Sequence, residues 1–196
     1  RVVAETGLML ETISAEEEAG LALKGCLPLI DQGAPHALVF DIGGGSTEVM
    51  LMDTRNGGSD MTGWVSLPFG VVNLSERYGG GTLPVSVYDS MVAEVDQYLS
   101  PFCERHGVSA LVDRGEAQLL GTSGTVTTLT GVHLGLARYD RAVVDGAYLD
   151  FDDIRVMSDR LRGQDCADRA AHPCIGAERA DLVVAGCAIL EAICRR

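Results

Sequence analysis

Three consecutive glycines between two apolar runs restrict how this chain can fold more than any other feature. The run at residues 36–42 is short and apolar, and residues 47–52 are again rich in apolar and β-branched side chains. Glycine tolerates the backbone angles that tight turns need. The pattern therefore predicts two strands joined by a glycine turn. A Walker A loop and a dinucleotide-binding fingerprint both require a helix after their glycines, so neither fits.

The glycine turn carries the residue types of a phosphate site. Successive N–H groups in such a turn can form an anion-binding nest, and glycine lets the main chain approach a phosphate closely. Acidic residues bracket the turn, where they could hold Mg²⁺ or a water. An ordinary hairpin turn is the alternative interpretation. The predicted phosphate ligands are Gly43, Gly44, Gly45, Ser46 and Thr47, and the predicted metal ligands are Asp41 and Glu48.

A second glycine turn follows the apolar run at residues 117–121. There the chain is expected to pass from a strand into a helix over about residues 126–136, which directs backbone N–H groups towards an anion. Tight packing between strand and helix would also explain these glycines. The candidate phosphate ligands of this second turn are Gly121, Thr122, Ser123, Gly124 and Thr125.

Three glutamates stand at the start of a helix predicted from Ser14 to about residue 30. With Ser14 as N-cap, Glu17 completes a capping box. Glu18 shares a helix face with Leu21 and Gly25, so we expect an apolar or closely packed surrounding that could raise its pKa and make it a general base. A purely structural role, in which the acids complement the helix dipole, is equally consistent with the spacing.

The remaining pattern predicts an α/β protein in which strands alternate with helices. Further strands are expected at residues 8–13 and 63–67, and further helices at residues 71–78, 87–106, 152–161 and 179–193, with Pro101 ending or kinking the helix at residues 87–106. The chain has 28 acidic and 15 basic residues, a net charge of −13, and no basic run, which argues against nucleic acid or membrane partners.

Six segments together resemble the exopolyphosphatase / guanosine pentaphosphate phosphohydrolase (Ppx/GppA) family of the actin-like ATPase superfold. The resemblance implies a ribonuclease-H-like lobe with a mixed sheet, with residues 1–18 as the end of a first lobe and hinge, residues 19–196 as the second lobe, and the first lobe absent. Ala15 departs from the glycine often found there. The matching segments are residues 5–14, 17–19, 39–48, 67–72, 121–125 and 178–181.

Carried over residue by residue, the resemblance implies that Glu18 activates the attacking water, that Asp41 and Glu48 hold Mg²⁺ and water, and that residues 43–47 grip phosphate. It implies a cytoplasmic hydrolase that releases terminal phosphate from inorganic polyphosphate and also converts pppGpp to ppGpp, with a homodimer left open. Because the first lobe's phosphate loop is missing, we expect the chain alone to be weakly active or inactive. The alternatives are an ATP-dependent kinase of the same superfold and a non-catalytic module that binds polyphosphate or a guanosine penta- or tetraphosphate.

Overall fold

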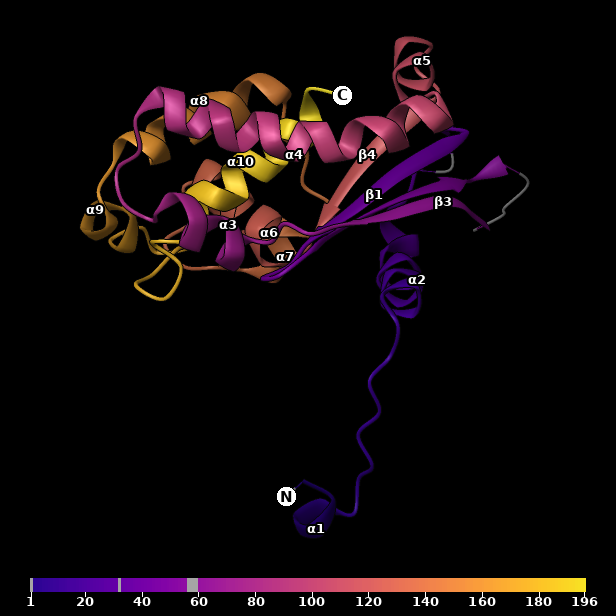
Figure 1. The fold of residues 1–196 in the computed structure, drawn as a ribbon, viewed down its shortest axis with the longest axis horizontal. Helices are drawn as coiled ribbons and strands as arrows, with labels where there is room; N and C mark the ends of the chain where they lie inside the picture. The colour runs from indigo at the N-terminus through magenta and orange to yellow at the C-terminus, as the bar shows by residue number, and fades with distance from the viewer. Residues whose placement is uncertain (1, 32, 56–59) are drawn as a thin grey trace.

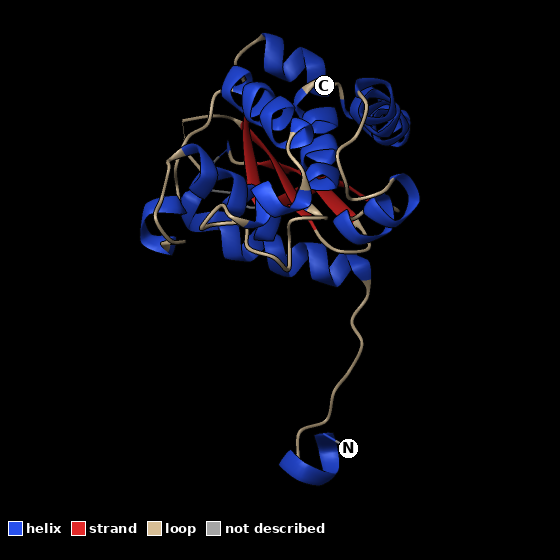
Figure 2. Ribbon diagram, turned by 90° about the vertical axis from the view of Figure 1, so that its left-hand side faces the viewer, coloured by secondary structure: helices blue, strands red, loops and turns tan. Residues whose placement is uncertain are grey.

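A four-stranded mixed sheet forms the centre of the protein, and helices cover both of its faces (Figures 1 and 2). The computed structural model describes residues 2–31, 33–55 and 60–196. The strand order is β3-β2-β1-β4, with β1 (His36–Ile42) antiparallel to β2 (Thr47–Asp53), β2 antiparallel to β3 (Asp60–Leu67), and β1 parallel to β4 (Ala117–Thr122). The predicted α/β, ribonuclease-H-like lobe with a mixed sheet is confirmed.

The helices divide unequally between the two faces of the sheet. One face carries α2 (Ala15–Cys26), and the other face carries the long helices α4 (Val85–His106) and α10 (Val183–Cys194) (Figure 1). The other elements are α1 (Val2–Thr6), η1 (Leu27–Leu29), α3 (Val71–Tyr78), α5 (Val108–Asp113), α6 (Ser123–His133), α7 (Arg141–Val144), α8 (Phe151–Gly163) and α9 (Cys166–Ala170).

The two faces of the sheet bury separate apolar clusters. The cluster beneath α2 contains Ala37, Val39 and Met50, whereas the larger cluster under α4 and α10 contains their strand neighbours, such as Leu38 and Phe40. Successive side chains on a strand point to opposite faces. Both faces are covered, and β1 and β2 each contain an unbroken apolar run, at residues 37–40 and 49–52.

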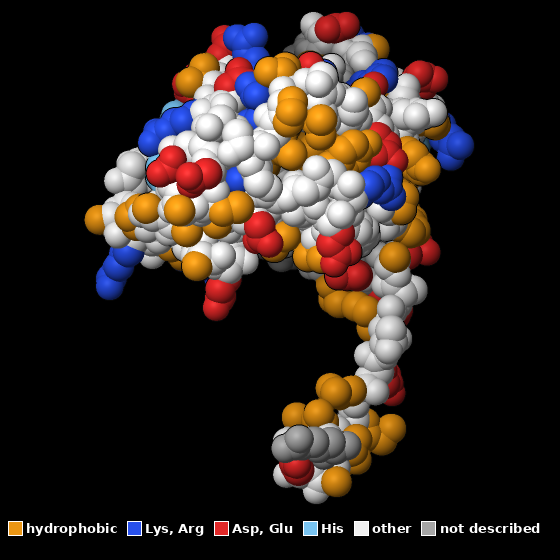
Figure 3. Space-filling view, turned by 60° about the vertical axis from the view of Figure 1, so that its left-hand side comes forward, with side chains coloured by type: hydrophobic (Ala, Val, Ile, Leu, Met, Phe, Trp, Pro, Cys, Tyr) orange, Lys and Arg blue, Asp and Glu red, His pale blue; other side chains and the backbone are white. Residues whose placement is uncertain are grey.

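The segment predicted as a strand at residues 8–13 is not one. It runs as an extended connection between α1 and α2, away from the body of the protein (Figure 1), and no described strand pairs with it. Its apolar side chains are exposed, as the space-filling view illustrates (Figure 3): Met9 is 78% exposed and Leu10 73%. The alternating pattern at residues 8–13 therefore predicts an extended backbone, but it does not predict that this backbone pairs with another strand.

Several helix boundaries also differ from the sequence prediction. Helix α8 begins after Asp150 and not at Asp152, and α10 begins at Val183, because residues 177–182 form turns. Pro101 lies inside α4 without ending it. Helix α6 begins three residues earlier than expected and stops at His133, where Gly135 takes a positive φ of 64°. No helix in the described part of the chain has the length and apolarity needed to cross a bilayer.

Candidate functional site

The predicted glycine turn joins β1 to β2 as a four-residue loop, Gly43 to Ser46. It is closed by a hydrogen bond of 3.0 Å from the N–H of Gly43 to the carbonyl of Ser46. The flanking residues Ile42 and Thr47 are cross-strand partners, which confirms the glycine-turned hairpin. Thr47 is fully buried, and its hydroxyl donates to the carbonyl of Phe69 over 2.7 Å, so this side chain anchors the loop.

Helix α3 donates hydrogen bonds to the carbonyl groups of this loop. The N–H groups of Val71 and Val72 donate to the carbonyls of Gly43 and Gly44 over 3.0 and 2.9 Å. The amide of Asn73 donates to the carbonyl of Gly45 over 2.7 Å. Within the described residues, the N–H groups of Gly44, Gly45 and Ser46 have no backbone acceptor. With its carbonyls taken up by α3, the loop has these N–H groups left for an anion.

The close approach of α3 depends on Gly70, which precedes the helix. A Cβ on Gly70 would lie 2.2 Å from the carbonyl carbon of Gly44 and 2.4 Å from the nitrogen of Gly45. Any side chain there would collide with the backbone of the loop. The Leu-Pro-Phe-Gly-Val-Val segment therefore has a structural task that the sequence did not reveal: its glycine lets the helix bond the loop.

Asp41 and Glu48 form a directly opposed pair at the base of the loop. Directly opposed residues of an antiparallel pair project from the same face, and here it is the α2 face. Glu48 is only 5% exposed, and the Ser66 hydroxyl on β3 donates to its Oε1 over 2.9 Å. Ser66 was missed in the sequence, because its relation to Glu48 depends on the β2–β3 register.

The second glycine turn lies beside the first. Strand β4 is parallel to β1, and Thr122 is the register partner of Asp41, so both turns leave the sheet at the same strand ends. The predicted strand-to-helix turn is confirmed, with Thr122 as N-cap of α6. Ser123 has a φ of 74°, which is uncommon for a residue other than glycine and is a form of strain found at ligand sites.

Close packing fixes this second turn. A Cβ at Gly121 would lie 2.5 Å from the Phe40 ring, and a Cβ at Gly186 of α10 would lie 2.5 Å from Cγ2 of Thr125. Tight packing therefore does account for Gly121. It does not account for Gly124, whose nearest neighbour at a Cβ position would be the Arg179 guanidinium at 3.5 Å.

Arg179 is a further residue of this region that the sequence analysis did not assign to the site. Its Nη1 donates to the Thr128 hydroxyl over 2.8 Å, one helical turn beyond Gly124. In a chain of net charge −13, a guanidinium next to the turn supplies the local positive charge that a phosphate needs. The sequence signal that could have identified Arg179 is its place in the Glu-Arg-Ala-Asp segment at residues 178–181, one of the six segments that resemble the family.

Helix α2 touches the site through its last residue, Cys26. Burial raises the pKa of the Cys26 thiol, a hydrogen bond with Thr122 opposes that shift, and the nearby Asp41 carboxylate adds to it. The thiol therefore lies under the strand ends that carry both turns. The capping box at the other end of the helix is confirmed: the Glu17 N–H donates to Ser14 Oγ over 3.2 Å and the Ser14 N–H donates to Glu17 Oε2 over 2.9 Å.

The expected packing around Glu18 is wrong. The buried face of α2 carries Ala19, Leu23 and Cys26, whereas Glu18 is exposed and Leu21 on its own face is 58% exposed. Glu18 and Ala19 are neighbours on the helix and point in different directions, so only one of them can face the sheet, and it is Ala19. Within the described residues, no hydrogen bond links Glu18 to the loop or to the acidic pair, so its assigned role as the base remains a prediction.

The acidic pair fits Mg²⁺ by its donor chemistry. No group of three or more His, Cys, Asp or Glu side chains gathers in a metal-binding arrangement among the described residues. Mg²⁺ is commonly held by one or two carboxylates together with water and substrate phosphates. Asp41 and Glu48, beside a loop with three N–H groups that lack a backbone acceptor in the described part of the chain, match that requirement.

Fold and site together define an α/β lobe in which two glycine turns, a guanidinium and a pair of carboxylates meet at the ends of adjacent strands. The chain belongs to the Ppx/GppA phosphatase family, whose profile matches residues 1–196.

The relatives of known name agree with this membership. Exopolyphosphatase 2 of Mycobacterium tuberculosis is 29% identical over 190 residues, covering 96% of this chain and 56% of that protein. The guanosine-5'-triphosphate,3'-diphosphate pyrophosphatase of Aeromonas salmonicida is 29% identical over 189 residues, covering 94% of this chain and 34% of that protein.

Solved structures are similar over the whole chain. The crystal structure of an exopolyphosphatase-like protein has a TM-score of 0.84 at 30% identity and covers 100% of this chain and 61% of its own. An Aquifex aeolicus Ppx/GppA family member has a TM-score of 0.81 at 24% identity. The chain thus spans less than two thirds of the length of these relatives. The boundary between hinge and second lobe near residue 18 remains a prediction.

Proposed function

We propose that this chain is the phosphate-gripping lobe of a Mg²⁺-dependent hydrolase that releases terminal phosphate from inorganic polyphosphate. The observation that carries the proposal is the Gly43–Ser46 loop, whose three glycine carbonyls accept hydrogen bonds from α3 while three of its N–H groups have no acceptor among the residues that the structure describes. The relatives named exopolyphosphatase support polyphosphate as the substrate, and those named for guanosine pentaphosphate support pppGpp as a second one.

In the proposed reaction the loop binds the terminal phosphoryl group. Its N–H groups would stabilise the equatorial oxygens as charge develops on them during in-line displacement. The Arg179 guanidinium and the second turn would hold the next phosphate along the chain. Asp41 and Glu48 would hold Mg²⁺, which when bound offsets the charge of the transferred group.

Glu18 is proposed as the base that takes a proton from the attacking water. The support is its match to the family's catalytic glutamate. Its exposure leaves the carboxylate free to meet substrate, and Glu17 beside it is occupied by the capping box. Loss of a general base costs about 10²–10⁴ in rate. Glu17→Gln retains a side chain that can serve the capping box, and is the matched control for Glu18→Gln.

The test is phosphate release by the intact protein from polyphosphate, pppGpp and ATP, measured side by side. We expect release from polyphosphate, a large drop in kcat for Glu18→Gln, and near-normal kcat for Glu17→Gln. The Mg²⁺ concentration for half-maximal rate should rise in Asp41→Asn and Glu48→Gln, whereas Glu116→Gln, before the far end of β4, should leave it unchanged. Binding of polyphosphate without release would favour the non-catalytic module, and phosphoryl transfer from ATP to an acceptor would favour the kinase.

A further inference from the structure

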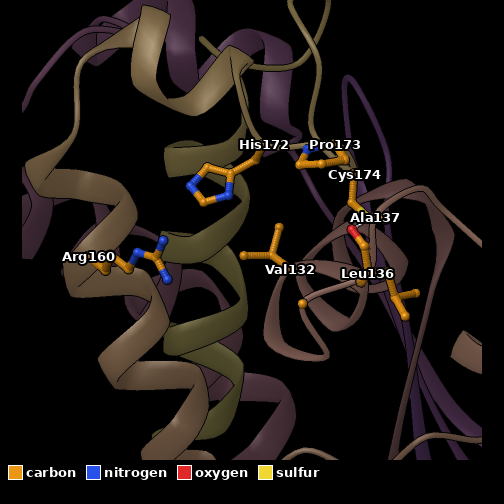
Figure 4. Close-up of a pocket in the computed structure, with 9 residues that line it drawn as sticks. Val132, Leu136, Ala137, Arg160, His172, Pro173 and Cys174 are labelled. Carbon is orange, nitrogen blue, oxygen red and sulfur yellow. Dashed lines mark hydrogen bonds between the residues drawn. The ribbon is translucent and has the colours of Figure 1, made fainter.

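A cavity lies at the opposite end of α6 from the turn at residues 121–125. Helix α6 begins at Ser123 in the turn and ends at His133, so its two ends are separated by about 16 Å at 1.5 Å per residue. The cavity has a volume of about 250 Å³. It is lined by Val132, Leu136, Ala137, Arg160, His172 and Cys174, among others (Figure 4).

The end of α6 shapes this cavity. Gly135 takes a positive φ, the N–H of Leu136 donates to the carbonyl of Gly131 over 3.1 Å, and the N–H of Gly135 donates to the carbonyl of Val132 over 3.1 Å. This is the Schellman pattern of a helix end. The thiol of Cys174 is hydrogen-bonded to the carbonyl of Leu136 at 3.6 Å. The carbonyls that would otherwise repel an anion here are thus bonded to donors.

Arg160 brings a positive charge to the cavity without an internal partner. It lies on α8, where Arg155 pairs with Asp152 and Arg162 pairs with Asp159, each one turn earlier. Arg160 has no hydrogen bond or ion pair within the part of the chain that the structure describes. An unpaired guanidinium beside a cavity, in a chain with 28 acidic residues, marks a place where an external anion would be favourable.

His172 is the second polar side chain in the cavity that could contact an anion. One ring nitrogen, Nε2, lies 3.3 Å from the Gln164 amide nitrogen, and the other, Nδ1, has no hydrogen-bond partner among the described residues, so it could contact a ligand. Burial lowers the pKa of His172, and the Arg160 charge lowers it further, while Asp168 acts in the opposite direction. In Figure 4 the Arg160 guanidinium and the His172 ring turn towards each other and towards Val132.

We propose that this cavity binds a small organic carboxylate, with the carboxylate between Arg160 and His172 and a short apolar tail against Val132, Leu136 and Pro173. The guanidinium fork matches carboxylate geometry, and apolar walls favour a ligand with an apolar body over a bare inorganic ion. This site is separate from the two glycine turns at residues 43–46 and 121–125, and it does not depend on the function proposed for them.

The experiment titrates the 196-residue chain with butyrate while the His172 ring resonances are followed by NMR. Butyrate should shift them saturably, butyramide, which lacks the charge, should not, and inorganic phosphate, which lacks the tail, should bind more weakly. Arg160→Gln should weaken butyrate binding by about tenfold or more, the loss expected for one charge-assisted contact. Arg155→Gln removes the same charge from the same helix away from the cavity and should bind as the unmodified chain does.

The pKa of His172 provides an independent measurement. A carboxylate next to the ring favours the protonated form, so saturating butyrate should raise this pKa. The proposal is overturned if butyrate leaves the His172 resonances unchanged, or if Arg160→Gln and Arg155→Gln bind it equally well. It is also overturned if phosphate binds better than butyrate. Thermal midpoints of both variants verify that each is folded, and a folded Arg160→Gln with undiminished affinity is decisive.

Discussion

Replacing Gly70 by alanine is expected to displace the Gly43–Ser46 loop, which we propose binds phosphate. The new Cβ would lie 2.2 Å from the carbonyl carbon of Gly44 and 2.4 Å from the nitrogen of Gly45. Gly70 has a φ of −128°, which alanine adopts freely, so the cost arises from the collision and not from the backbone angles. Because the colliding atoms are backbone, they cannot rotate away, and either α3 or the loop must move.

The expected loss of stability in Gly70→Ala follows from the interactions between α3 and the Gly43–Ser46 loop. Overpacking by one methyl costs about 1–3 kcal/mol. The two backbone hydrogen bonds from Val71 and Val72 would lengthen or break, at about 1 kcal/mol each. We expect a loss of about 3–5 kcal/mol in the free energy of unfolding. For a chain of this size that corresponds to a fall in Tm of about 6–20 °C.

The assay combines urea unfolding with tripolyphosphate binding. Gly70→Ala should lose both stability and affinity, because the loop's N–H groups lose their alignment. Gly81→Ala is the matched control, since a Cβ there meets nothing within 4 Å, and it should change neither. Wild-type stability and wild-type binding in Gly70→Ala would refute the view that α3 holds the loop.

Three further predictions test other contacts. Gly186→Ala should destabilise the chain by about 1–3 kcal/mol in urea unfolding, because the new Cβ would lie 2.5 Å from Cγ2 of Thr125. The control is Gly25→Ala in α2, where a Cβ has no neighbour within 4 Å; it should stabilise the chain by up to about 1 kcal/mol, because alanine favours a helix more than glycine does. Ser66→Ala should raise the Mg²⁺ requirement of phosphate release several-fold by freeing Glu48, and Ser66→Thr should restore it; equal requirements would remove Ser66 from the site. Hydrogen bonds from Ser14 lower the pKa of Glu17, so the capping box stabilises the fold above the ordinary Glu pKa and this contribution disappears as the pH falls through the lowered value. Glu17→Gln should therefore reduce the loss of stability between about pH 5 and 3, and an unchanged pH profile would contradict the assignment.

Features that depend on neighbouring residues could be predicted from the sequence. The glycine turn, the acids beside it and the Ser14–Glu17 box are set by backbone freedom and by spacing within one turn, and all of them occur where expected. The two turns could be placed together only through the parallel pairing of β1 with β4.

Features that depend on contacts between distant segments could not be predicted. The pattern at residues 8–13 gave the extended backbone, but strand pairing needs a partner that no local signal supplies. The spacing on α2 gave the relative angles of Glu18 and Ala19 without indicating which of them faces the sheet. The contacts of Gly70 with Gly44, of Ser66 with Glu48 and of Arg179 with Thr128 join elements far apart in the chain.

The central claim is that the Gly43–Ser46 loop binds phosphate through its N–H groups. The most direct measurement is a titration of the ¹⁵N-labelled chain with tripolyphosphate and Mg²⁺, following the backbone amide resonances. The amides of Gly44, Gly45 and Ser46 should shift most and should saturate together, because these loop donors have no internal acceptor in the described ranges 2–31, 33–55 and 60–196. Unchanged resonances at these three amides, with saturable binding elsewhere on the chain, would contradict the account.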